Sequence, residues 1–242
     1  MNRVYLDYNA SAPLREEARE AMVHAMALAG NPSSVHAEGR QARAIVEIAR
    51  QQVAAALGAQ GADVIFTSGA TEAAGLALNG RGIRCADIEH EAVSSWCQSD
   101  LSCGSDGGVA CEAPEATALQ LANSETGILQ QLPEGLALCD MTQAFGKLPV
   151  AFHWTGATMA LVSAHKIGGP KGVGALIVKR GTEVAAQIKG GGQEMGRRSG
   201  TENVIGIAGF GAAAEAAQRD LADGVWEQVE KLRNILEKAV AQ

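Results

Sequence analysis

The sequence predicts an α/β fold, in which strands and helices alternate along the chain. Short apolar runs of strand length recur between segments with helical apolar spacing, and polar clusters follow several of these runs. The 242 residues are 47% hydrophobic and 19% charged, as expected for a globular chain with a sizeable core.

Two helices are predicted first. Residues 15–29 follow Pro13, place two glutamates in the first turn and repeat apolar residues at helical spacing. After a breaker at 30–34, residues 36–57 show one apolar face and end at Gly58, a typical C-terminal stop.

The elements that follow alternate in type. Residues 64–67 form a short buried strand, and a helix begins at Ala70 after a tight turn. Residues 99–115, rich in Ser, Gly and Asp, are expected to form a loop, and the chain from 203 onward is helical with a break near Asp223. Five further runs have strand length: 83–87, 117–122, 136–139, 158–163 and 173–178.

Charge and hydropathy exclude several functional classes. Twenty basic against 27 acidic side chains give a net charge of -7 without a basic run, so no nucleic-acid partner is expected. The apolar stretches are too short to span a membrane, and the first residues lack the apolar region of a signal peptide. We therefore expect a cytoplasmic protein without membrane association.

The cysteines predict neither a disulfide framework nor a metal site. Their number is odd, their spacing is irregular and no C-x-x-C pair occurs. They are Cys85, Cys97, Cys103, Cys111 and Cys139. We interpret each as a buried or surface thiol.

The first polar cluster, residues 67–72, joins the strand at 64–67 to a helix through a glycine turn. Backbone N–H groups around Gly69 and Ala70, with the Thr71 hydroxyl, could bind a phosphate. An ordinary helix N-terminus with Glu72 in its first turn explains the pattern equally well.

The second cluster, residues 140–143, follows the strand predicted at 136–139. A carboxylate fixed there, Asp140, could hold a ring nitrogen protonated, as pyridoxal-phosphate (PLP) enzymes require, and Gln143 could bind the phenolic oxygen. The alternative is that Asp140 simply caps a helix.

The third cluster, residues 163–166, places Lys166 at a strand end before a glycine-rich loop. A lysine with a lowered pKa is the nucleophile that forms Schiff bases, and Ser163 and His165 could reach a phosphate. A surface lysine in a glycine loop remains the alternative.

A fourth segment, residues 190–201, combines many glycines with Arg197 and Arg198. It could approach an anion or another chain closely, or be a flexible surface loop. The sequence contains no G-x-G-x-x-G or Walker pattern, so nucleotide binding is not supported.

These motifs, taken in order, resemble the cysteine desulfurases of the class V aminotransferase group. The resemblance covers nearly the whole chain, and the Ser-x-His-Lys and Arg-Ser-Gly-Thr motifs are its most specific parts. The matching segments are 5–10, 30–36, 66–72, 89–90, 123–127, 140–147, 163–174 and 190–201.

The resemblance implies a role for each site residue. Lys166 would form the Schiff base with PLP, His90 would stack on the pyridine ring, and Asp140 would pair with the ring nitrogen. Only the Glu89-His90 motif supports this role for His90, because the residue taken alone would be interpreted as an ordinary loop histidine. Gln143 and Asn123 would contact the phenolic oxygen or the substrate carboxylate. The phosphate would be held by Ala70, Thr71, Ser163 and His165. Thr201 would reach the phosphate bound by the partner subunit, so the active enzyme would be a homodimer.

The implied fold is the large domain of PLP-dependent transferase fold type I, a mixed, mostly parallel sheet sandwiched by helices, with part of a small α+β domain. Residues 13–220 would be the PLP-binding large domain, 1–12 would belong to the small domain, and 221–242 would be the helix leading into a truncated C-terminal small domain. The implied reaction takes sulfur from L-cysteine, giving L-alanine and an enzyme persulfide for iron–sulfur cluster assembly or another acceptor protein.

The sequence departs from the family in two respects. None of the five cysteines matches the motif of the family's nucleophile, which, like its substrate-carboxylate arginine, is expected beyond residue 242. The segment 80–140 is also short, so a crossover helix is expected to be reduced or lost. These departures leave open a relative with another substrate, such as a selenocysteine lyase, or a non-catalytic PLP-binding subunit.

Overall fold

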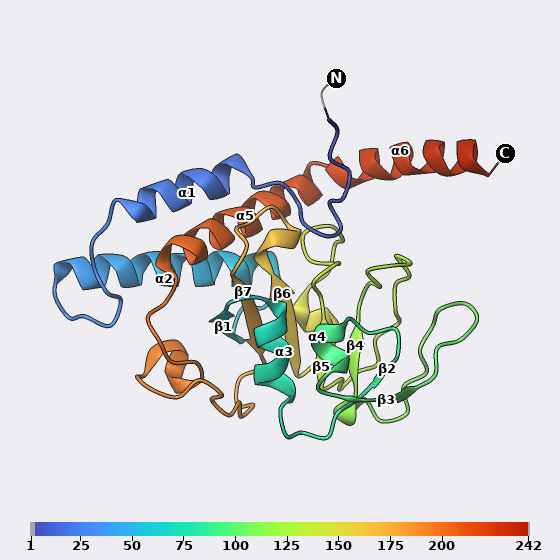
Figure 1. Ribbon diagram of the computed structural model, residues 1–242, viewed down its shortest axis with the longest axis horizontal. Helices are drawn as coiled ribbons and strands as arrows, with labels where there is room; N and C mark the ends of the chain where they lie inside the picture. Colours follow the sequence, from blue (N-terminus) through green and yellow to red (C-terminus); the bar gives the residue numbers. More distant parts are fainter. Residues whose placement is uncertain (1–2, 242) are drawn as a thin grey trace.

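The computed structural model describes residues 3–241, and its centre is a mixed five-stranded sheet (Figure 1). Short buried segments rich in β-branched and other apolar residues form these strands, as their patterns predict. In spatial order the strands are β1 (Asp63–Thr67), β7 (Gly174–Val178), β6 (Met159–Ser163), β5 (Leu138–Asp140) and β4 (Ala118–Gln120).

Strand direction brings four strand ends to one edge of the sheet. The pairs β4–β5 and β5–β6 are parallel, whereas β7 is antiparallel to both of its neighbours, β6 and β1. Consequently β1 runs in the same direction as β4, β5 and β6, and the carboxyl ends of these four strands share an edge. Gly174 begins β7 at this edge, where a Cβ atom would lie 2.7 Å from the Gly69 backbone.

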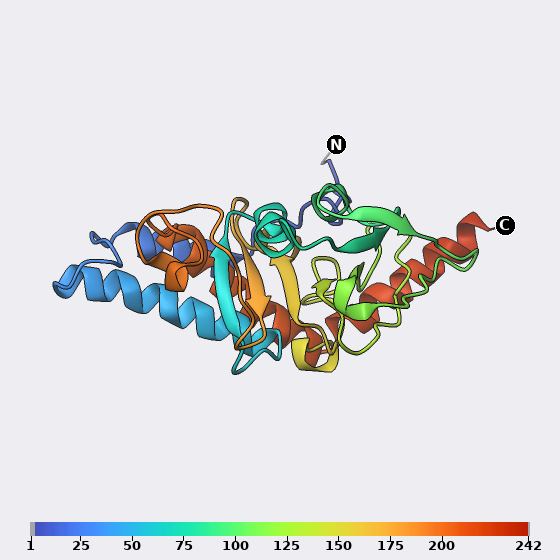
Figure 2. The ribbon, with the colours of Figure 1, turned by 90° about the horizontal axis from the view of Figure 1, so that it is seen from below.

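Helices cover both faces of the sheet (Figures 1 and 2). On one face α5 packs against α1 and α2, and on the other α3 lies over the sheet beside the short α4, while α6 extends away. The helices are α1 (Glu16–Met26), α2 (Ala37–Ala56), α3 (Ala70–Leu78), α4 (Glu91–Ser94), α5 (Val204–Ala222) and α6 (Val225–Val240). The 3₁₀ helices are η1 (Pro114–Ala116), η2 (Phe152–Trp154), η3 (Ala164–Lys166) and η4 (Gln193–Gly196).

The alternation of side chains along the strands divides the core into two layers. Phe66 of β1 packs in the cluster that includes Phe210 of α5. The next residue towards the N-terminus, Ile65, packs in the second cluster with Leu76 of α3. Burying each large apolar side chain stabilises the fold by about 1.5–3 kcal/mol relative to leaving it exposed.

The structure confirms the predicted α/β fold, with element boundaries that differ from the predicted ones by no more than three residues. The break near residue 223 is also confirmed, because α5 ends at Ala222 and Gly224 has a positive φ of 71°. The predicted loop at 99–115 is wrong at its start, where β3 (Gln98–Leu101) pairs in parallel with β2 (Arg84–Ala86). Its residues are polar and mostly exposed, so no apolar pattern marks this strand.

Helical structure is scarce in the segment 80–140. The helix α4 has four residues, and the connection from β3 to β4 contains only the 3₁₀ helix η1. Among residues 3–241, no helix is both long and apolar enough to cross a membrane. The assignment of 1–12 to a small domain, and of 221–242 to a helix that leads into it, remains a prediction.

Candidate active site

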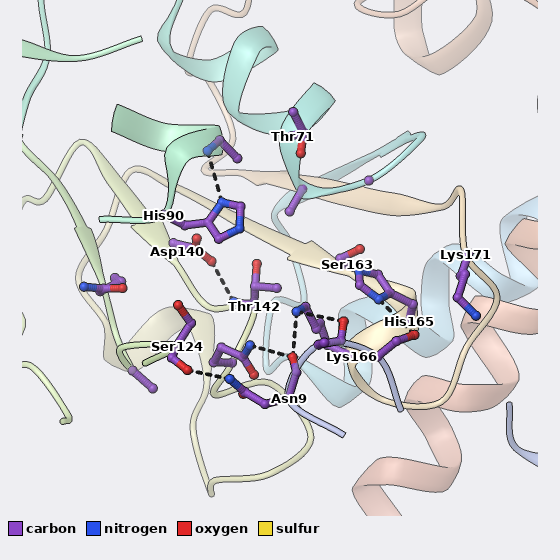
Figure 3. A pocket seen from close by; sticks show the side chains of 18 of the residues that line it. Asn9, Thr71, His90, Ser124, Asp140, Thr142, Ser163, His165, Lys166 and Lys171 are labelled. Atoms are coloured by element: carbon purple, nitrogen blue, oxygen red, sulfur yellow. Dashed lines mark hydrogen bonds between the residues drawn. The ribbon is translucent and has the colours of Figure 1, made fainter. Parts of the chain in front are cut away.

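A cavity of about 880 Å³ opens at the sheet edge where β1, β4, β5 and β6 end (Figure 3). The short loops after these strands turn their polar side chains towards a common space, as expected at the carboxyl ends of parallel strands. Most of the predicted site residues line it: Ala70, Thr71, His90, Asp140, Gln143, Ser163, His165 and Lys166.

Lys166 reaches this cavity from η3, directly after β6. Its Nζ donates hydrogen bonds to the carbonyl oxygens of Asn9 at 2.7 Å and Ala10 at 3.1 Å. Partial burial lowers the pKa of Lys166, although the nearby Asp140 and other carboxylates oppose this shift. The amine is therefore deprotonated, and hence nucleophilic, more often than that of an exposed lysine.

Asp140 is the last residue of β5, and its carboxylate accepts a hydrogen bond from the Thr142 N–H at 2.8 Å. Burial raises the pKa of Asp140, while this hydrogen bond and electrostatic interactions with the nearby His90 and Lys166 side chains act in the opposite direction. A cationic N–H group placed against the carboxylate would favour its ionised form. The position is suited to a protonated ring nitrogen.

His90 caps the N-terminus of α4, where its Nδ1 accepts a hydrogen bond from Ala92 N–H at 3.0 Å. This bond places the proton of the neutral ring on Nε2 and fixes the ring orientation. In Figure 3 the imidazole projects from α4 into the cavity on the same side as Asp140.

The N-terminus of α3 and three basic side chains line the same cavity and could bind an anion. Gly69 caps α3 without a side-chain hydrogen bond, so N–H groups of the first turn remain free, and Thr71 lies beside them. His165, Lys166 and Lys171 line the same cavity. Burial and the neighbouring lysines lower the pKa of His165, as expected where positive charge gathers.

The amide of Gln143 has a defined orientation. Lys147 Nζ donates to its Oε1 at 2.6 Å, and its Nε2 donates to the carbonyl oxygen of Asn9 at 3.0 Å. Because an ammonium group can only donate, the oxygen must face Lys147 and the NH2 group must point the other way.

Two predicted residues lie outside the cavity lining. Asn123 is buried, accepts hydrogen bonds from Thr126 N–H and its hydroxyl at 2.8 and 3.1 Å, and donates to Ile88 O at 3.0 Å. Its side chain therefore holds the turn that follows β4. Thr201 is exposed and does not line the cavity.

The arginines of the segment 190–201 bind carboxylates of this chain. Arg197 pairs with Asp63 at 2.7 Å, and Arg198 pairs with Glu72 at 2.8 Å. These ion pairs anchor the segment to β1 and α3, so it is more than a flexible surface loop.

Several residues of the site were not identified from the sequence. Gln120 is the last residue of β4 and lies inside the run predicted as a strand. Thr142 belongs to the second polar cluster, but only Asp140 and Gln143 were assigned roles there. The N-terminal segment also contributes polar side chains to the cavity. Its local sequence does not show where this segment lies in the fold. Its cavity-lining polar residues are Asp7, Asn9 and Ser11.

The cavity lining contains no cysteine among the residues that the structure describes. Cys85 and Cys139 are buried in the core, and the other three are partly exposed elsewhere. Within residues 3–241, no group of His, Cys, Asp and Glu side chains is arranged to hold a metal ion.

Comparison with known proteins shows the family. The class-V aminotransferase model matches residues 4–98 and 112–242. A cysteine desulfurase of Frankia sp. (strain EuIK1) is 41% identical over 91% of this chain and 64% of its own length. The NifS-like protein of Rickettsia africae ESF-5 superposes with a TM-score of 0.92 at 32% identity, over 99% of this chain and 75% of that one.

A structure described as SspA in complex with cysteine matches with a TM-score of 0.80 and 29% identity, over 88% of this chain and 72% of that one. The matched relatives are longer, since this chain spans about two thirds of the length of the Frankia protein. The resemblance seen in the motifs is thus confirmed by sequence and by structure: the chain belongs to the class-V aminotransferase family, and the relatives that it matches include proteins named cysteine desulfurases.

Proposed function

We propose that this chain forms the PLP-binding part of an enzyme that removes sulfur from L-cysteine and leaves L-alanine. The observation that carries the proposal is the convergence of Lys166 Nζ, the half-buried Asp140 carboxylate and the free N-terminus of α3 on one cavity. A lysine amine and a carboxylate beside the ring nitrogen are groups with which PLP enzymes hold the cofactor, and a helix N-terminus suits its phosphate.

The residues present fit the cofactor. Bound PLP would supply an electron sink for the α-carbon of an amino acid. Asp140 would hold the proton on the ring nitrogen, and Lys166 would attach the cofactor covalently and move protons at the substrate. His90 would cover the ring face, and Gln143 would donate its NH2 group to the phenolic oxygen.

The phosphate would lie at the N-terminus of α3. The backbone N–H of Ala70, the Thr71 hydroxyl, Ser163 and His165 are the groups proposed to bind it. In this interpretation, phosphate binding explains why the β1–α3 turn has no side-chain cap of its own.

The proposed substrate is supported by the relatives. Several are named cysteine desulfurases, and one matched structure is described as a complex with cysteine. We further propose a cytoplasmic homodimer in which Thr201 reaches the partner's phosphate site, and a sulfur-acceptor protein as the recipient of the product.

A second candidate is a PLP-binding subunit that does not complete desulfuration. The observation that favours it is the lack of a cysteine in the described cavity lining, because sulfur transfer needs a thiolate to attack the substrate sulfur. Both candidates share the PLP site and differ only in turnover.

An L-cysteine titration separates the candidates. We expect the PLP-loaded chain to change its visible spectrum with L-cysteine, beyond the change shown by free PLP and by a Lys166→Ala control. Alanine and, with dithiothreitol present, sulfide are then measured. Formation of both supports the desulfurase, a spectral change without them supports the binding subunit, and a response identical to that of free PLP contradicts both.

A further inference from the structure

Glu89, which precedes His90, is a buried carboxyl that the proposed function does not use. It is 7% exposed and lies outside the cavity lining. Its Oε1 accepts a hydrogen bond from Gln120 N–H at 2.8 Å. Its Oε2 is also buried and has no hydrogen-bond partner among residues 3–241. A carboxylate would rarely be buried in this way without a compensating positive charge.

The backbone around Glu89 is joined to the end of β4 by three hydrogen bonds. Besides the bond to Glu89 Oε1, Gln120 Nε2 and Asn123 Nδ2 donate to the carbonyl oxygen of Ile88 at 2.9 and 3.0 Å. The helix α4 has only four residues, so it is too short to fix the position of His90 by itself. These three bonds therefore set where His90 enters the cavity.

The titratable groups that influence Glu89 are acidic or neutral. They are Asp140 on β5 and Cys85 on β2, while Cys97 and Cys139 are influenced in turn by Glu89. Burial, reinforced by Asp140 and Cys85, raises the pKa of Glu89 to about 9, against the effect of the Gln120 hydrogen bond. At neutral pH the carboxyl carries its proton.

We propose that Glu89 is a positioning residue: as an uncharged carboxyl it ties the segment that carries His90 to the end of β4, and leaves the negative charge behind the cofactor ring to Asp140. The roles of His90 and Asp140 in this statement rest on the proposed function. A second anion at Glu89 would repel the Asp140 carboxylate and raise its pKa.

The proposal has a consequence for stability that requires no cofactor. A carboxyl whose pKa is raised in the folded protein favours the unfolded state progressively as pH rises from the ordinary carboxyl range towards the folded pKa, here about 9. Glu89→Gln keeps the shape and the acceptor for Gln120 N–H but cannot ionise, so it should escape this loss.

The first experiment is thermal denaturation of the chain from pH 5 to pH 8. We expect the midpoint of Glu89→Gln to match that of the unsubstituted chain near pH 5 and then to exceed it by an amount that grows by up to about 3 °C per pH unit. Glu91→Gln, which changes an exposed carboxyl two residues away, is the control and should show no growing difference. A gap that does not change with pH for Glu89→Gln would overturn the claim that the carboxyl is uncharged.

The second experiment measures PLP affinity at pH 7 by absorbance. Glu89→Gln should bind within about twofold of the unsubstituted chain, whereas Glu89→Leu, which loses the acceptor for Gln120 N–H, should bind roughly tenfold more weakly. Circular dichroism checks that both variants fold. Equal weakening by Gln and Leu would show that a charged carboxylate is needed, and unchanged binding by a folded Glu89→Leu would show that the contact positions nothing.

The two experiments distinguish failure of the proposed function from failure of the inference about Glu89. If the unsubstituted chain does not bind PLP, the proposed function fails while the denaturation series still decides the charge state of Glu89. If PLP binds and the series shows no pH-dependent gap, the inference fails and the proposed function stands.

Discussion

At the scale of single residues, the site depends on hydrogen bonds that fix side chains before any ligand arrives. Gln143 is the clearest case, because Lys147 determines which end of its amide faces the cavity. Burial, followed by the charge of Lys166, lowers the pKa of Lys147 to about 8. A partly buried ammonium group of this kind is retained at a cost in stability, which is consistent with a role in orienting Gln143.

Lys147→Met should therefore weaken PLP binding, because the amide of Gln143 becomes free to present either end to the phenolic oxygen. We expect the dissociation constant, measured by absorbance titration at pH 7, to rise roughly 3- to 10-fold, in line with one hydrogen bond. Gln143→Ala is the matched variant. Adding it to Lys147→Met should change little, and additive losses would contradict the argument.

The sequence predicts those site residues that stand just after an apolar run, such as Asp140 and Lys166. Gln120 was missed because it is still inside its run, and Asn9 because it reaches the cavity from the far end of the chain. Asn123 shows the opposite case. It belongs to a matching motif, but its side chain bonds within its own turn instead of lining the cavity.

At the scale of elements, close approach of α2 and α5 supports one face of the sheet. A Cβ atom on Gly211 of α5 would lie 2.7 Å from the Ala49 Cα atom of α2, which is backbone and cannot rotate away. Replacing glycine by alanine inside a helix gains up to about 1 kcal/mol in propensity, whereas overpacking costs about 1–3 kcal/mol.

We expect the clash to dominate, so Gly211→Ala should lower the free energy of unfolding by about 1–2 kcal/mol. Urea denaturation measures this change. Gln218→Ala, at an exposed position of the same helix, should stay within about 0.5 kcal/mol. A stabilised Gly211→Ala variant would show that the helices can separate without loss.

Element types were predictable where an apolar period exists, as in α2 and in the strands of the main sheet. The strand β3 was not, because its residues are polar and mostly exposed and only its pairing with β2 defines it. The local sequence pattern cannot predict a strand that depends on pairing with a distant segment of the chain.

At the scale of the molecule, one buried ion pair joins three distant parts of the chain. Arg50 of α2 binds both carboxylate oxygens of Glu194, at 2.7 and 2.9 Å, and Glu194 also accepts from Phe66 N–H of β1 at 2.9 Å. Glu194 is 5% exposed and has a positive φ of 46°, so this contact holds a strained segment in place.

Glu194→Leu should lower the free energy of unfolding by about 3 kcal/mol, because the partly buried guanidinium of Arg50 keeps only its longer pair with Glu47 and its bond to Val64 O, and Phe66 N–H loses its acceptor. Chemical denaturation of this variant is compared with Glu230→Gln, which breaks an exposed ion pair and should cost no more than about 1 kcal/mol. A loss equal to that of the control would mean that the pair does not link these parts of the fold.

The whole account depends on a covalent bond between PLP and one amine, so the most direct test identifies that amine. The PLP-loaded chain is reduced with borohydride, digested, and its peptides are weighed by mass spectrometry. We predict the added pyridoxyl-phosphate mass on Lys166, with no labelling there in Lys166→Ala. Labelling confined to another lysine, such as Lys147 or Lys171, would contradict the central claim.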